Sequence, residues 1–184
     1  MFTDVRSKKI ALVSHCILNQ NSISDGTADF NCCDYEVVNL LLQNRIGIIQ
    51  MPCPELNCLG LDRGNPKGAE SEVIVENSRI RKSMNKKTPK EKLNTIVQNL
   101  AYQIEEYLKY NFQIVGIIGI DRSPNCGVNT TSRDNMEVEG TGVFISLLQK
   151  ELKKRKIVIP FTGIKALETK KSISSIKKML RKRN

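Results

Sequence analysis

The stretch IGIIQMPCPELNCLG (residues 46–60) contains an apolar run that ends at a cysteine between two prolines. Residues 46–51 are rich in isoleucine, which predicts a short buried strand. Pro54 cannot donate to a ladder of backbone hydrogen bonds, so the strand must end near Cys53. A cysteine at the end of a buried strand can be core packing, a nucleophile or a metal ligand.

Three further apolar runs resemble residues 46–51 in length and composition. They cover residues 9–15, 114–120 and 157–161, and each predicts a buried strand. The sheet therefore has at least four strands, and the polar stretches between them must hold the connections.

Helical patterns fill most of these connections. Asp34 is placed to cap a helix, and Thr88 with Glu91 forms a capping-box pattern ahead of a long apolar stripe. Residues 141–152 and a basic segment over about 168–184 also show helical spacing. Residues 54–87 are predicted to be irregular, apart from a short helix near 72–82.

Strands that alternate with helices predict an α/β fold, because parallel strands need crossover connections. We expect a Rossmann-like three-layer arrangement, with a mainly parallel sheet of four or more strands flanked by helices. No long linker interrupts residues 1–184, which predicts a single domain. In such sheets, ligands bind beyond the carboxyl ends of the strands.

The composition narrows the class of protein. Hydrophobic residues make up 40% of the 184 residues and charged residues 26%, which is typical of a soluble globular chain. The N-terminal sequence MFTDVRSKK lacks the apolar centre of a signal peptide, and no apolar run is long enough for a membrane helix. We therefore expect a cytoplasmic protein without membrane contact, whose six cysteines serve thiol or metal chemistry rather than disulfides.

The positive charge is concentrated at one end of the chain. Residues 150–184 contain 13 Lys or Arg and 2 Asp or Glu, although the whole chain carries a net charge of +10. Such a tail could bind the phosphate groups of an RNA. It could equally be the solvated face of a helix, and the sequence leaves both interpretations open.

Three of the cysteines follow three different predicted strands. Cys16 and Cys53 come directly after the first and second strands, and Cys126 lies six residues beyond the third. Parallel topology places all three at one edge of the sheet, where they could hold zinc or an iron–sulfur cluster with an open iron. Cys33 or Cys58 could supply a fourth ligand, and packing of small buried thiols is the alternative.

The sequences around these cysteines resemble the thiouracil desulfidase family. The shared motifs are SHCIL (14–18), CPE (53–55) and SPNCG (123–127), and each stands behind a predicted strand. The similarity is greater to a small, single-domain branch related to these desulfidases. It extends over the longer stretches SHCILNQN, IIQMPCPE and GIIGIDRSPNCGV.

The resemblance implies a [4Fe–4S] cluster held by Cys16, Cys53 and Cys126, with one iron open to a thiocarbonyl sulfur. Water then replaces that sulfur, and sulfide is released. The implied substrate is a thiolated pyrimidine base, a nucleoside or a related small thiolated compound. Carried over by motif, the catalytic residues are Glu55 and Ser123.

Elementary chemistry supports these two roles. Hydrolysis of a thiocarbonyl needs a base to activate water, and Glu55 lies two residues from a candidate ligand. Ser123 could donate a hydrogen bond to the substrate, although a serine before a proline is also common in turns. His15, Asn19 and Asp121 are candidate substrate-binding residues. The first two replace an alanine and a glycine of the S-A-C-L-L-G form, so the substrate need not be thiouracil itself.

Other enzyme classes lack support in the sequence. His15 is the single histidine, the G-x-S-x-G motif of many serine hydrolases is absent, and no phosphate-binding glycine motif is present. The alternative function is a non-catalytic redox or metal sensor that binds zinc or a cluster, with RNA contact through the basic tail. The sequence does not specify the oligomeric state.

Overall fold

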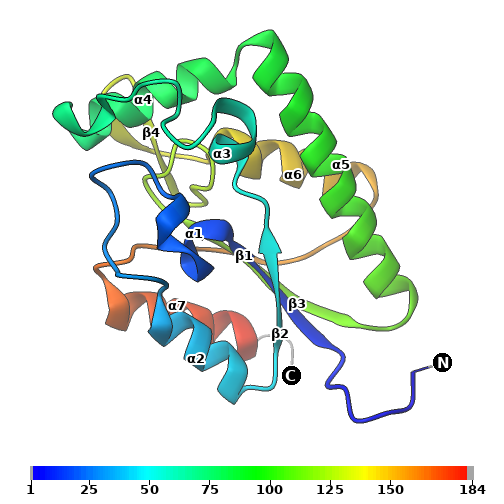
Figure 1. Ribbon diagram of the computed structural model, residues 1–184. Helices are drawn as coiled ribbons and strands as arrows, with labels where there is room; N and C mark the ends of the chain where they lie inside the picture. Colours follow the sequence, from blue (N-terminus) through cyan, green and yellow to red (C-terminus); the bar gives the residue numbers. More distant parts are fainter. Residues whose placement is uncertain (1, 182–184) are drawn as a thin grey trace.

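A four-stranded parallel sheet forms the centre of the protein (Figure 1), as seen in a computed structural model that describes residues 2–181. The strand order is β2-β1-β3-β6, and each neighbouring pair is parallel. This arrangement confirms the predicted α/β fold with a parallel sheet. The strands are β1 (Lys9–Ser14), β2 (Gly47–Met51), β3 (Gln113–Ile120) and β6 (Phe161–Ile164).

Helices cover both faces of this sheet (Figure 1). On one face lie α2 and α7, and on the other lie α5 and α6. A two-stranded antiparallel hairpin follows the loop after β3. The helices are α1 (His15–Leu18), α2 (Tyr35–Gln43), α3 (Pro54–Leu59), α4 (Val73–Met84), α5 (Lys87–Lys109), α6 (Val143–Lys154) and α7 (Thr169–Arg181), and the hairpin strands are β4 (Thr130–Arg133) and β5 (Met136–Glu139).

Alternation along β1 divides the apolar core into two halves. Ile10 and Leu12 belong to the core beneath α5 and α6, whereas Ala11 and Val13 belong to the core beneath α2 and α7. Successive side chains of a strand point to opposite faces, so an uninterrupted apolar run is what a strand buried on both faces requires.

The pairing of β1 with β3 shifts register near the point where α7 packs on the sheet. Ile10 pairs with Ile114, but Ala11 pairs with Gly116. A Cβ atom on Gly116 would lie 2.2 Å from Sδ of Met179, so glycine allows the Met179 side chain to lie directly on the strand. The bulge and the glycine together let α7 seal one face of the sheet.

The strand predicted at residues 157–161 is wrong in its position, because pairing with β3 begins only at Phe161. Pro160 has no N–H group, and it contributes only its carbonyl oxygen, which accepts from the backbone N–H of Ile117 over 2.9 Å. Val158 is 84% exposed, which a buried strand does not permit. The ladder therefore extends from Phe161 to Ile164.

The segment 54–87 is more regular than predicted. The helix α3 begins at Pro54, directly after Cys53, and α4 confirms the short helix expected near residues 72–82. Proline suits the first position of a helix, because its missing N–H group has no partner there. The capping-box prediction at Thr88 is also wrong, since α5 begins at Lys87 and Lys86 occupies the capping position.

The predicted basic C-terminal helix is present as α7 (Figure 1). It begins at Thr169, and its described part ends at Arg181, so residues 182–184 of the prediction lie outside the described residues. Neither α7 nor any other helix within residues 2–181 combines the length and apolar character needed to cross a membrane.

Candidate functional site

Three cysteines reach one pocket from three different strand ends. Cys16 is the second residue of α1 after β1, Cys53 precedes α3 after β2, and Cys126 lies in the loop after β3. All three line a pocket of about 320 Å³ at the carboxyl edge of the sheet. The structure thus brings together three thiols that are far apart in the sequence.

The position of Cys53 is fixed by the helix that it caps. Its Sγ atom accepts a hydrogen bond from the backbone N–H of Leu56 over 3.5 Å, and Pro54 occupies the first helical position. A thiol at this position faces the N-terminal end of α3, where helical N–H groups favour negative charge. The sequence C-P-E therefore holds a thiol at the end of a strand.

The position of Cys126 is fixed by Ser123 and by two glycines. The Ser123 hydroxyl oxygen accepts from the backbone N–H groups of Asn125 and Cys126, over 3.2 and 3.0 Å. A Cβ atom on Gly119 would lie 2.3 Å from the Cys126 carbonyl oxygen, and one on Gly127 would lie 2.1 Å from that of Thr130. Close backbone approach therefore explains the glycine of S-P-N-C-G.

Cys126 is buried, Cys16 and Cys53 are half-buried, and the three thiols act on one another electrostatically. Burial, followed by the charges of Cys53 and Glu55, raises the pKa of Cys16 to about 12. Burial raises the pKa of Cys126 well above its usual value, and Cys16 and Cys53 add to that effect. The pKa of Cys53 is also raised, first by burial and then by Glu55. Binding of a metal would therefore release protons from these thiols.

These residue types fit a soft metal centre. Thiolates are the preferred ligands of zinc and of iron–sulfur clusters. One nitrogen of the Arg63 guanidinium, Nη2, lies 3.8 Å from Sγ of Cys53, so a cation is present to balance a thiolate. Within residues 2–181, no three cysteine, histidine or carboxylate side chains are arranged as a complete metal-ligand set.

Glu55 lies in the same pocket and is held by three side-chain donors. Its Oε2 atom accepts from Nε of Arg63 over 3.2 Å and from the Ser24 hydroxyl over 3.4 Å. Its Oε1 atom accepts from Nδ2 of Asn125 over 2.9 Å. Glu55 is only 9% exposed, so it is neither a surface carboxylate nor free to rotate.

Arg63 is the central side chain of this network and was missed by the sequence analysis. It is 2% exposed, and its guanidinium also donates to the carbonyl oxygens of Ser22, Gly60 and Leu61. Its φ angle of 55° lies in the left-handed region, which is unusual for arginine. The stretch around it is rich in glycine and polar residues and gave no sign that this arginine is buried.

Asn125 was also missed, although it stands inside the SPNCG motif. It is fully buried, and its Oδ1 atom has no hydrogen-bond partner within the described residues. Its place in the motif, directly before Cys126, is the signal that could have identified it.

The structure places His15 at the pocket, as it does Ser123. The Nε2 atom of His15 is buried and has no hydrogen-bond partner in the part of the chain that the structure describes. Burial, followed by the charge of Arg63, lowers the pKa of His15, so the neutral imidazole is favoured. The hydrogen-bonding capacity of this nitrogen is therefore unused at the pocket wall.

Asp121 and Asn19 are engaged elsewhere. Asp121 lines the pocket, but its Oδ1 atom accepts from the backbone N–H groups of Val128 and Asn129, over 3.0 and 2.9 Å. Asn19 does not line the pocket, and its side chain accepts from the backbone N–H of Asn21 over 3.1 Å. Both side chains stabilise the loops that carry the pocket residues.

The remaining cysteines lie outside the pocket lining. Cys33 lies beside Cys32, with 3.8 Å between their Sγ atoms. Cys58 is on α3 and packs against the core beneath α5, and burial raises the pKa of its thiol. Neither Cys33 nor Cys58 contributes to the pocket wall.

Comparison with known proteins places the chain among relatives. No model of a known protein family matches it. The "Uncharacterized protein MJ0003" of Methanocaldococcus jannaschii is 31% identical over 177 residues, which cover 96% of each chain. The solved structure of a [4Fe–4S]-dependent thiouracil desulfidase, TudS, matches 84% of this chain and 90% of its own, with 15% identity and a TM-score of 0.44. On the identity and coverage of the first match, this chain belongs to the same family as MJ0003.

Proposed function

We propose that this protein is an iron–sulfur-dependent desulfidase. It hydrolyses the C=S group of a thiolated pyrimidine base, nucleoside or related compound to C=O, and it releases sulfide. The observation that carries this proposal is a single pocket lined by Cys16, Cys53 and Cys126 together with the buried carboxylate of Glu55. The motifs around these residues support the same function.

The three cysteines would hold the cluster, which supplies a soft Lewis acid for the thiocarbonyl sulfur. Glu55 accepts a proton from the attacking water, and Arg63 and Asn125 keep its carboxylate in one orientation. The Ser123 oxygen already accepts two backbone N–H groups, so its own proton is available for the substrate. A C–O bond forms, the C–S bond breaks, and the sulfur leaves as hydrogen sulfide.

The charges of the pocket favour an uncharged substrate. Its lining contains five carboxylates and three cations, although the whole chain is strongly basic. All three cations are already paired, because Lys165 lies 2.8 Å and Arg122 3.6 Å from Glu137, and Arg63 lies 3.2 Å from Glu55. A neutral base or nucleoside therefore suits this wall better than a phosphorylated compound does.

The test is anaerobic reconstitution with iron and sulfide, followed by incubation with thiouracil and thiouridine. We expect a coloured protein that contains iron and releases sulfide. Glu55→Gln should retain the iron and lose turnover, whereas Glu36→Gln, on the exposed face of α2, should retain both. A protein that binds zinc and releases no sulfide from either compound would instead identify the non-catalytic metal-binding alternative.

A further inference from the structure

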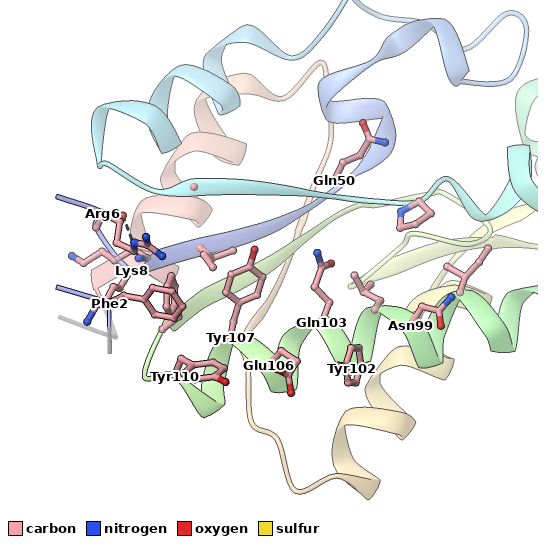
Figure 2. A pocket seen from close by; sticks show the side chains of 18 of the residues that line it. Phe2, Arg6, Lys8, Gln50, Asn99, Tyr102, Gln103, Glu106, Tyr107 and Tyr110 are labelled. Carbon is pink, nitrogen blue, oxygen red and sulfur yellow. Dashed lines mark hydrogen bonds between the residues drawn. The ribbon is translucent and has the colours of Figure 1, made fainter. Parts of the chain in front are cut away.

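A second hollow, of about 1100 Å³, lies between the edge strand β2 and the helix α5 (Figure 2). Among residues 2–181, β2 pairs with β1 alone, so its other edge borders this groove. The groove meets the cysteine pocket where β2 leads into α3. Pro52 and Asn57 line the groove, while Cys53 and Pro54 line the pocket.

Aromatic residues are concentrated in this groove. The chain has four tyrosines, five phenylalanines and no tryptophan, and five of these nine aromatic residues line the groove. Tyr102 and Tyr110 are 62% and 45% exposed, and Figure 2 shows Tyr107 extending from α5 toward β2. The five residues are Phe2, Tyr102, Tyr107, Tyr110 and Phe112.

The exposed face of α5 that borders the groove has an unusual composition. Asn99, Tyr102, Gln103, Glu106 and Tyr107 on α5, and Tyr110 directly after it, line the groove at spacings of three and four residues. A solvated helix face normally carries charged and polar side chains, so the tyrosines are the unusual members of this face. With Gln50 and Asn57 opposite, the groove offers four amide side chains, each of which can both donate and accept hydrogen bonds.

Positive charge gathers near the N-terminal segment. Arg6, Lys8 and Lys9 line the groove, and Glu106 is the acidic residue of its lining. Arg6 lies over the Phe2 ring, 4.3 Å from its centroid, and it also pairs with Asp4. Lys109 lies 3.6 Å from Glu106 and offsets its charge. The groove thus complements a polyanion that also presents flat, hydrogen-bonding rings.

We propose that this groove binds single-stranded RNA. Bases stack on the exposed tyrosine rings, Lys8 and Lys9 contact phosphates, and the amide side chains contact base edges and 2′-hydroxyl groups. The helix α7 offers positive charge but no aromatic residue, so it lacks this combination. RNA binding needs no cluster, and this proposal therefore stands independently of the proposed function.

The test is fluorescence anisotropy with a labelled single-stranded RNA, measured with the full-length protein over a range of salt concentrations. Tyr102→Ala should weaken binding about fivefold or more, because loss of one stacked base costs at least that much. Lys8→Gln with Lys9→Gln should weaken binding and reduce the steepness of its salt dependence.

Two matched controls separate the groove from the rest of the surface. Tyr35→Ala removes an equally exposed tyrosine on α2, and Lys177→Gln with Lys178→Gln removes two exposed charges from α7. Both should leave binding near that of the wild type. Equal binding of DNA of the same sequence, loss only in the α7 variant, or no binding at low salt would each overturn the proposal. Self-association that Tyr102→Ala abolishes would instead make the groove an interface between two copies.

Discussion

Asn125 donates from Nδ2 to Oε1 of Glu55 over 2.9 Å, and this bond joins the loop after β3 to the helix after β2. The two residues are 70 positions apart in the sequence, and each lies within two residues of a candidate cysteine ligand. Asn125 is fully buried, so water cannot replace its amide as a donor. The orientation of Glu55 therefore depends on both loops at once.

Replacement of Asn125 by alanine should cost stability and activity together. The variant leaves a buried carboxylate oxygen without its donor, which costs about 1–3 kcal/mol. Urea unfolding followed by circular dichroism measures this cost. Asn85→Ala, which removes an exposed amide that donates to the Arg81 carbonyl, serves as the control and should cost less. Equal losses of unfolding free energy in the two variants would show that the hydrogen bond from Asn125 to Glu55 stabilises the fold no more than an exposed one does.

Replacement of Arg63 by glutamine should be more damaging. The carboxylate of Glu55 would remain buried beside the pocket thiols without the positive charge of Arg63. Breaking a buried ion pair in this way costs about 3–5 kcal/mol of stability. The double variant Arg63→Gln with Glu55→Gln removes both charges and should be less destabilised than the two single losses combined. Urea unfolding of all four proteins tests this coupling. Strictly additive losses would mean that the two side chains do not interact.

A second carboxylate, Glu76, should make stability depend on pH. Hydrogen bonding to Arg79 lowers the pKa of Glu76, while burial opposes the shift. The ionised form is favoured in the folded state, so this stabilisation is present above pH 4.5 and is lost as pH falls through the lowered pKa. Arg79 also donates to the Arg63 carbonyl oxygen over 2.8 Å, which extends the effect to the loop that carries Arg63.

The measurement for Glu76 is the difference in unfolding free energy between the wild type and Glu76→Gln. It should be largest near neutral pH and should shrink progressively below pH 4.5. Glu70→Gln is the control, because Glu70 is exposed and pairs only loosely with Lys67, at 3.5 Å. A Glu76 difference that stays constant with pH would exclude this titration as its source.

The strands, and the edge of the sheet at which the cysteines meet, could be predicted from the sequence. Both depend on local apolar patterns and on the rule that parallel strands end at the same edge. Apolar runs such as residues 114–120 identify buried strands, and the parallel order then places the residues that follow them at one edge. Asp34 was also predictable, and its Oδ1 atom accepts from the backbone N–H of Val37 over 3.2 Å, as a capping residue should.

The features that the sequence did not predict correctly, the start of α5 and the burial of Arg63, depend on tertiary contacts. Thr88 and Glu91 match a capping box, but the turn after α4 starts the helix earlier and makes Thr88 an ordinary helical residue. The buried Arg63 guanidinium donates not only to nearby carbonyl oxygens but also to that of Ser22, 41 positions away, and to the Glu55 carboxylate. The residues next to Arg63 in the sequence do not indicate hydrogen-bond partners that are distant in the chain.

Replacement of single cysteines by serine should separate the pocket thiols from the others. Cys16→Ser, Cys53→Ser and Cys126→Ser each remove one of three soft donors from the pocket wall, so iron content and visible absorbance after anaerobic reconstitution should fall sharply. Cys58→Ser is the matched control, because Cys58 is also half-buried but packs against the core beneath α5. It should bind iron as the wild type does. If Cys58→Ser lost the cluster while Cys126→Ser retained it, the assignment of the three ligands would be wrong.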